Sequence, residues 1–386
     1  MKTNRLYIIA AAVVLLMTSC YDDSQMLTIV NEDGTCSREM SFHPSPDAVM
    51  APLSEEINNN GLRFKSDWQR TWSVVGDSVR HACPITQEQW DSLQRAFPQQ
   101  LVASKILMHT KRDFQSVSEM SDSLTEVGDH VFKATGSLEK HFKWFYTDYV
   151  YTETFIIAIM DQLFPIPLDR FVSADTASYW FTGLPNLAED MSGTEQKELL
   201  DEIEPLMSKW LNANTFSYIY TYIANVFWKD IKTPPVSKEQ FLANQDAIIM
   251  SPAVRDMELF NATEQVGKIL KDYYHTDAFS PLFKDDKHWD RILDHQYMSY
   301  KYILAMKHQY DLVMPGRVLD SGIGKLDGSV IHYKFSGERL IPHDYVITAT
   351  SRVTNVWAFI VTILIIVLAI GSFFIRKKGR LNVKCG

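Results

Sequence analysis

The segment Val330–Ser336, VIHYKFS, alternates apolar and polar side chains with a period of two. This pattern predicts a β-strand with one buried face, inside a β-rich stretch from 313 to 350. The stretch before it, about 165–310, has apolar residues at helical spacing instead. Further strands are predicted near the start of the chain, at 26–30 and 35–42. Strands at both ends with helices between them predict an α+β fold, a β-rich domain that carries a large helical insertion.

Helix starts in the sequence support this division. Capping boxes begin at Thr86, Ser192 and Ser237, and Asn261 leads a cap of the same kind. We therefore expect the first part of the α+β domain over 20–160, the helical insertion over 161–310 and the closing strands over 311–355. A single continuous strand is expected over 137–155.

The first residues have the pattern of a secretory signal peptide over 1–19. Lys2 and Arg5 precede the apolar run Leu6–Met17, and Thr18-Ser19-Cys20 follows it. The end of this run resembles a bacterial lipobox, which implies cleavage before Cys20 and attachment of lipid, palmitate included, to that residue. A plain signal peptide or an uncleaved anchor with an incidental cysteine is the alternative.

The other end contains an uncharged apolar stretch, Val356–Ile375, followed by Arg376-Lys377-Lys378-Gly379-Arg380. Its length would cover about 30 Å as a helix, which predicts a transmembrane helix over 356–375. Basic residues after a span stay in the cytoplasm, so 376–386 is expected inside. The predicted location is the bacterial inner (plasma) membrane, single-pass, with the bulk of the chain in the periplasm and the β domain membrane-proximal.

Composition narrows the classes of function. Of 386 residues, 46% are apolar and 12% aromatic, which excludes a disordered chain. The formal net charge of −9 argues against a surface for nucleic acid, which needs clustered Lys and Arg. We therefore expect no nucleic-acid partner.

Two cysteines, Cys36 and Cys83, fall in the part predicted to lie outside the cytoplasm, where a disulfide could persist. Two small buried apolar side chains are the equal alternative, because sequence alone does not show whether their Cβ atoms meet. No cysteine–histidine spacing typical of a zinc site occurs, so no metal is expected.

The most unusual segment is His141–Phe155, HFKWFYTDYVYTETF. Aromatic residues on both faces of a strand favour a central, buried strand. The alternative is a displayed aromatic surface, including Trp144 and Tyr146, that stacks on sugar rings. Burial is the more common fate of aromatic side chains, and solvent exposure of Trp144 would favour the surface.

Motifs of known chemistry give little support for an enzyme. Asp320-Ser321-Gly322 has the letters of an aspartic-protease motif, but no second copy exists and a turn explains it. Ser137-x-x-Lys140 lacks the partner motifs of penicillin-binding enzymes. We predict no enzyme activity and no cofactor.

The chain resembles LppM-type bacterial envelope lipoproteins. The resemblance is carried by Cys20, the Asp33-Gly34 turn, the capped helix 86–97, Met314-Pro315-Gly316 with Asp327-Gly328, and the apolar stretch from Val356. It implies a membrane-tethered β domain without an active site, and it does not cover 165–310.

We therefore predict a membrane-anchored bacterial envelope lipoprotein that is a non-catalytic binding or structural protein. Its partners would be the membrane, through the N-terminal lipid and the C-terminal helix, and an unknown envelope protein or glycan. The alternative is an enzyme or carbohydrate-binding factor acting on envelope polymers.

Overall fold

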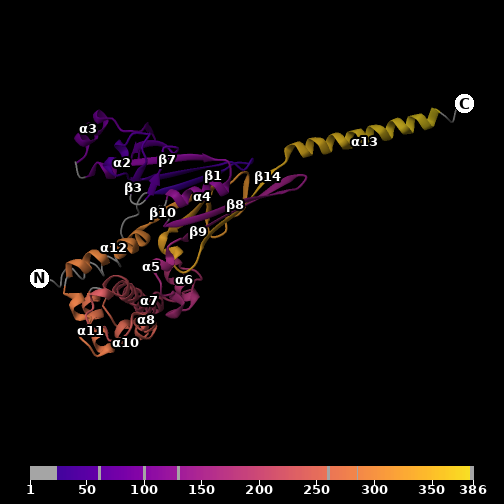
Figure 1. Ribbon diagram of the computed structural model, residues 1–386. Coiled ribbons are helices and arrows are strands. Elements are labelled where there is room, and N and C mark those ends of the chain that lie inside the picture. The colour runs from indigo at the N-terminus through magenta and orange to yellow at the C-terminus, as the bar shows by residue number, and fades with distance from the viewer. Residues whose placement is uncertain are drawn as a thin grey trace. The chain divides into compact units, whose positions relative to one another are not determined.

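A computed structural model describes residues 24–59, 62–98, 101–127, 131–258, 261–284 and 286–382 of the chain (Figure 1). These residues form two compact units. One is mainly helical and contains Ile156–Lys307 with Phe335–Tyr345. The other holds most of the strands, from residues before 156, from His308–Lys334 and from residues after 345. The predicted signal peptide and Cys20 lie outside the described residues.

The β-rich unit is built on an eight-stranded sheet of order β12-β13-β10-β1-β2-β7-β5-β6. Strand β1 pairs parallel with β10 and antiparallel with β2, so the closing strands of the chain join its first strand. Gly34 in the β1–β2 turn has a φ of 98°, a conformation that glycine adopts without strain. The strands of this sheet are β1 Gln25–Val30, β2 Cys36–Phe42, β5 Gln69–Val74, β6 His81–Ala82, β7 Ile106–Phe114, β10 Lys307–Val313, β12 Lys325–Asp327 and β13 Val330–Ser336.

A second sheet of order β11-β14-β9-β8 and helix α4 belong to the same β-rich unit. Side chains of the two sheets meet in a fully buried network, where Arg38 Nη2 of β2 lies 2.7 Å from Glu153 Oε2 of β9. A small hairpin pairs β3 with β4. The remaining elements of this part are α2 Pro46–Met50, β3 Ile57–Asn59, β4 Leu62–Phe64, α3 Gln87–Ala96, α4 Val117–Val127, β8 Phe132–Phe142, β9 Tyr146–Ile157, β11 Arg317–Asp320, β14 Tyr345–Thr354 and α13 Val356–Asn382.

The helical unit packs around one apolar core, in which Phe216, Tyr220, Phe241 and Trp289 are buried. Its longest helix, α7, starts with a capping box in which Ser192 and Glu195 bond each other's backbone. The helices are α5 Met160–Leu163, α6 Ala174–Thr182, α7 Gly193–Tyr222, α8 Lys238–Ala243, α9 Gln245–Ile249, α10 Pro252–Arg255, α11 Ala262–Tyr274 and α12 Asp286–Ala305.

One major prediction is corrected. No helix in the described part of the chain combines the length and the apolar character needed to cross a membrane. Helix α13, Val356–Asn382, begins where the span was predicted. The transmembrane helix over 356–375 is therefore wrong. So is the single-pass inner-membrane location. The cytoplasmic tail 376–386 and the membrane-proximal β domain were deduced from that span and lose this support.

Several local expectations also differ from the structure. The single strand over 137–155 is two strands, β8 and β9, because Lys143 N–H donates to Tyr146 O and reverses the chain there. Helix α4 was not predicted. Asn261 makes no side-chain cap on α11. The capping box at Thr86 and Gln89 is confirmed, as is the cap at Ser237.

Candidate functional site

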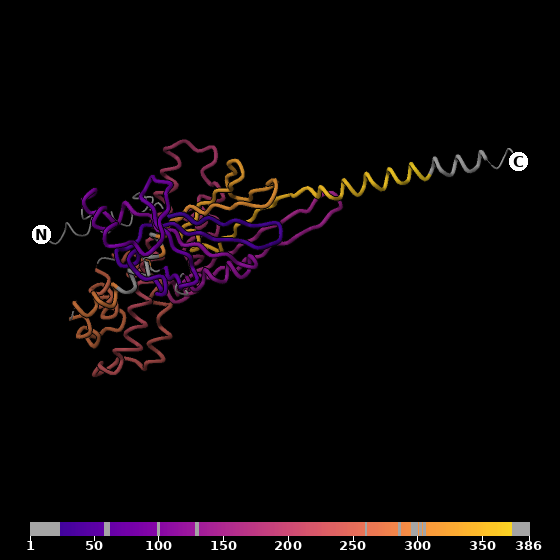
Figure 2. Tube along the Cα trace, turned by 90° about the horizontal axis from the view of Figure 1, so that it is seen from above, coloured from indigo at the N-terminus to yellow at the C-terminus, as the bar shows by residue number. Residues whose placement is uncertain are grey.

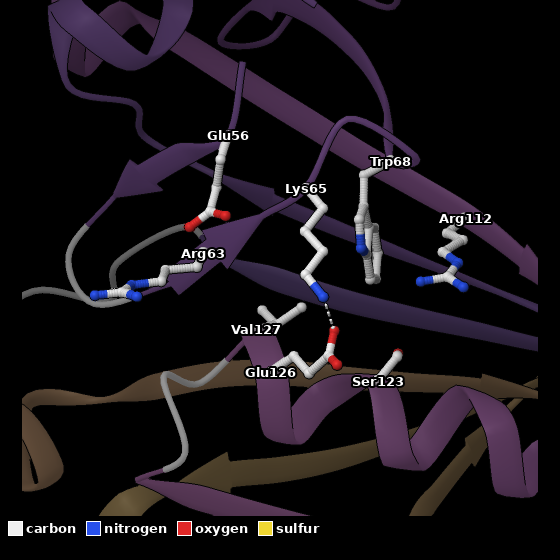
Figure 3. Close-up of a pocket in the computed structure, with 8 residues that line it drawn as sticks. All are labelled: Glu56, Arg63, Lys65, Trp68, Arg112, Ser123, Glu126 and Val127. Atoms are coloured by element: carbon white, nitrogen blue, oxygen red, sulfur yellow. Dashed lines mark hydrogen bonds and ion pairs between the residues drawn. The ribbon is translucent and has the colours of Figure 1, made fainter. Parts of the chain in front are cut away.

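A recess of about 130 Å³ lies in the β-rich unit (Figure 3). Arg63 comes from β4, Lys65 and Trp68 from the connection to β5, Arg112 from β7 and Glu126 from α4. Glu56, Ser123 and Val127 complete the lining. Five of its eight lining residues are therefore charged, three of them cationic.

Lys65 and Arg112 of the recess are each paired with a carboxylate. Lys65 Nζ and Glu126 Oε2 point toward each other across it and lie 2.5 Å apart (Figure 3). This hydrogen bond raises the pKa of Lys65 above its usual value. At the other end, Arg112 Nη1 lies 2.8 Å from Asp67 Oδ2. Both Lys65 and Glu126 are more than half exposed, so water screens their attraction and the pair can open for a ligand.

One wall of the recess is rigid. Trp68 is buried and packs edge-to-face against Phe64 at 5.3 Å and against Phe114 at 6.0 Å between ring centroids. Phe64 in turn stacks on Phe42. The recess thus combines a fixed aromatic edge with fixed charges, and only Trp68 and Val127 of its lining are apolar. Such a lining fits a polar, charged group better than an apolar one.

A second cluster lies on the face of the large sheet opposite to Arg38. Because side chains alternate along a strand, Glu39 and Ser41 of β2 share this face with His109 of β7, which pairs with Ser41. His109 Nδ1 lies 2.7 Å from Ser41 Oγ, and its Nε2 lies 3.0 Å from Ser73 Oγ. Arg80 holds Glu39 with two bonds of 2.7 and 2.6 Å. Burial, and then the positive charge of Arg80, lower the pKa of His109, while Glu39 at 3.8 Å opposes them.

This environment predicts a pH dependence of stability. The folded state favours neutral His109, whereas the unfolded chain takes up a proton near the ordinary pKa of about 6.5. As the pH falls through 6.5, the unfolded state binds more protons, and the free energy of unfolding decreases. We expect His109→Gln to lose less stability than the wild type between about pH 7 and about pH 5 in urea titrations. Parallel curves for the two proteins would contradict this.

A third cluster centres on Asp311 of β10, which is almost fully buried. His332 Nδ1 of β13 lies 2.6 Å from Asp311 Oδ1, and Gln309 Nε2 donates to the same oxygen at 3.0 Å. Gln25 donates to the other carboxylate oxygen. A carboxylate behind an imidazole orients that ring, as it does in general bases. The described contacts of His332 place no nucleophile on it, so the pair alone defines no reaction.

The two cysteines and the Asp320-Ser321-Gly322 motif, which the sequence analysis discussed, lie in different environments. Cys36 and Cys83 are both free, buried thiols, and burial raises the pKa of Cys36 to about 12 and that of Cys83 to about 11. The structure therefore shows two buried thiols at Cys36 and Cys83 and no disulfide between them. Asp320-Ser321-Gly322 forms a turn, in which Gly322 N–H donates to Asp320 Oδ1 at 2.9 Å.

Trp144 was expected to be buried in a strand, but it is 44% exposed, which favours the alternative of a displayed aromatic side chain. It lies in the turn between β8 and β9 and not within a central strand. Tyr146 is half-buried, and Arg352 packs over its ring at 3.7 Å. Trp144 and Tyr146 therefore do not form one platform: the first is displayed, and the second supports the Arg352–Asp148 ion pair.

Comparisons of the chain with protein families, with curated proteins and with solved structures found no match. The resemblance to LppM-type lipoproteins therefore stays a prediction.

Proposed function

We propose that the protein is a non-catalytic binding protein of the bacterial envelope, lipidated at Cys20, whose recess holds the acidic end group of an envelope glycan. The observation that carries the proposal is the lining of the recess, where Arg63, Lys65 and Arg112 face a small polar space beside Trp68. The lipid attachment is supported by the lipobox pattern alone, since Cys20 lies outside the described residues.

The size of the recess sets what it can hold. About 130 Å³ is well below the ~300–1,000 Å³ of pockets that enclose a whole small molecule. It fits one terminal group of a longer ligand, with the remainder of the ligand outside. A carboxylate on a sugar ring suits this space, because the acid meets cations and the ring meets the Trp68 edge.

Charge explains how a ligand would enter. Lys65 is held by Glu126, but the pair is exposed and weak. A ligand carboxylate replaces Glu126 as the partner of Lys65, while Arg112 keeps its contact with Asp67 and fixes the end of the recess. Binding therefore rearranges one surface ion pair and leaves the buried wall unchanged.

The test uses an oligosaccharide of uronic acids and the same oligosaccharide after its carboxyl groups have been reduced to alcohols. We expect calorimetry to show binding of the acidic form and at least about tenfold weaker binding of the neutral form, because a hydrogen bond to a charged group is lost. Lys65→Gln should weaken binding of the acidic form by a similar factor.

Lys111→Gln is the matched control. Lys111 precedes Arg112 on β7, is similarly exposed and lies on the opposite face of the strand, where it contacts only Asp113 among the ion pairs described. This variant should bind like the wild type. Equal affinity for the two oligosaccharides, no binding of either, or an unchanged affinity of Lys65→Gln would refute the proposal.

A further inference from the structure

An exposed group of aromatic side chains, here called the aromatic tip, lies where the β8–β9 turn meets the start of α13. It consists of Phe142, Trp144 and Phe145 from the turn and Trp357 and Phe359 from the helix. Their exposed fractions range from 39% for Phe145 to 59% for Phe142. Both views show this turn beside the beginning of α13 (Figures 1 and 2). Clustered exposed aromatic residues, unlike scattered ones, mark an interaction surface.

Ring–ring contacts and a hydrogen bond hold the side chains of the aromatic tip in fixed positions. Trp144 meets Trp357 edge-to-face at 5.3 Å, and Phe145 lies 4.7 Å from Phe359 between ring centroids. Phe142 stacks parallel to Trp357 at 6.4 Å. The indole N–H of Trp144 donates to Thr362 Oγ1 at 2.9 Å. These contacts fix the rings while leaving large parts of them in water, so their exposure is not a result of loose packing.

The backbone beneath the aromatic tip is held equally well. Asn355 Nδ2 donates to Lys143 O at 2.8 Å, and Asn355 N–H donates to Phe145 O. Thr147 Oγ1 donates to Asn355 Oδ1. One asparagine at the β14–α13 junction therefore joins the turn to the helix and orients both sets of rings.

The surroundings of the aromatic tip identify its partner. Exposed apolar side chains continue along α13, including Val356, Ile360 and Ile363. Lys143 lies in the turn between Phe142 and Trp144 and is exposed. Aromatic side chains beside apolar ones, with a lysine among them, match the layers of a lipid surface, where rings sit at headgroup level and cations meet anionic headgroups. A sugar is a poorer fit, because the Trp144 ring and its N–H are already engaged by Trp357 and Thr362.

We propose that the aromatic tip is a docking surface for anionic lipid, which places Trp144 at the headgroup level of a membrane surface. The proposal concerns contact with the interface and is independent of the glycan recess. It adds a second point of membrane contact to the lipid expected on Cys20.

Full-length protein with Cys20→Ser, which removes the acylation site, is mixed with phosphatidylcholine vesicles containing roughly one third phosphatidylglycerol. Some lipids carry bromine near the headgroup, which quenches tryptophan fluorescence on contact. We expect quenching in the parent protein and a clear loss of it in Trp144→Phe. Trp180→Phe, which alters a part-exposed tryptophan of α6, should keep the quenching of the parent.

Two further variants test affinity. Phe142→Ser/Trp144→Ser/Phe145→Ser should bind the vesicles at least about tenfold more weakly, since it removes exposed apolar area that binding would bury. Its matched control is Leu319→Ser/Ile323→Ser/Leu326→Ser, three equally exposed apolar residues on the same unit, which should bind normally. Lys143→Glu should weaken binding to the anionic vesicles by about tenfold and leave binding to pure phosphatidylcholine unchanged.

Unchanged quenching in Trp144→Phe, or equal binding by the two triple variants, would overturn the proposal. So would self-association of the protein in place of vesicle binding, because the occupant would then be a second copy. Binding of free oligosaccharide that quenches Trp144 without vesicles would assign the aromatic tip to a glycan instead.

Discussion

Glu153→Gln is expected to lower the free energy of unfolding by about 3–5 kcal/mol, the usual effect of leaving one member of a buried ion pair uncompensated. Glu153 and Arg38 are both fully buried, 2.7 Å apart. Tyr151, Tyr310 and Ser121 also donate to the Glu153 carboxylate, at 2.6, 2.7 and 2.8 Å. A glutamine amide at this position places a donor where four donors already converge. The substitution also removes the carboxylate charge that balances Arg38 in this network.

The pKa of Glu153 shows the same balance. Burial alone would raise it, but the charge of Arg38 and the hydrogen bonds from Arg38, Tyr151 and Tyr310 hold it below its usual value. The carboxylate is therefore ionised in the folded protein, and stability gained from it is present above the ordinary pKa and lost as the pH falls through the lowered one.

Urea unfolding of three variants separates the causes. Arg38→Met/Glu153→Leu should recover much of the loss, because replacing both charges by apolar groups removes the uncompensated one. Glu126→Gln, which breaks the exposed pair with Lys65, should change stability little. A loss below about 1 kcal/mol for Glu153→Gln would show that the network is solvated like a surface pair.

Local chemistry made parts of the fold predictable. The capping boxes at Thr86 and Ser192 need only residues three apart, so the sequence alone locates these helix starts. The Asp33-Gly34 turn between β1 and β2 is equally local, because the positive φ of Gly34 demands its residue type. The alternation in Val330–Ser336 likewise predicts β13.

Features built from distant residues were not predictable in this way. The recess joins Lys65 and Glu126, which lie 61 residues apart, and no local pattern connects them. The turn at 143–145 was missed because aromatic residues run through it without a glycine or proline. One signal was present for the buried network: Glu153 shares the period-two face of Tyr149, Tyr151 and Phe155, and a carboxylate on such a face requires a buried cation.

The aromatic tip shows why burial could not be read from residue type. Trp144 was assigned to a core because most aromatic side chains are buried. Trp144 instead occupies the turn between β8 and β9, where its ring packs against Trp357 of α13 and stays 44% exposed. The exposure of Trp144 follows from the chain reversal between β8 and β9, and no local sequence pattern predicts that reversal.

In the helical unit, Phe241→Ala is expected to cost about 3–5 kcal/mol of unfolding free energy, as large core truncations do. Phe241 is fully buried and stacks face-to-face on Tyr220, with centroids 3.9 Å apart. Trp228, Tyr274 and Phe279 surround it at 5.0, 5.7 and 5.4 Å. Removing the ring leaves a cavity between aromatic side chains that are too rigid to fill it.

The adjacent residue supplies the control for this prediction. Leu242 lies on the same helix, α8, but is 38% exposed, so Leu242→Ala should cost well below half as much in urea unfolding followed by tryptophan fluorescence. Both substitutions place alanine in α8, and alanine favours helix at either position. Equal losses in the two variants would therefore mean that Phe241 contributes through the helix alone, and that the aromatic stack with Tyr220 adds nothing to the core.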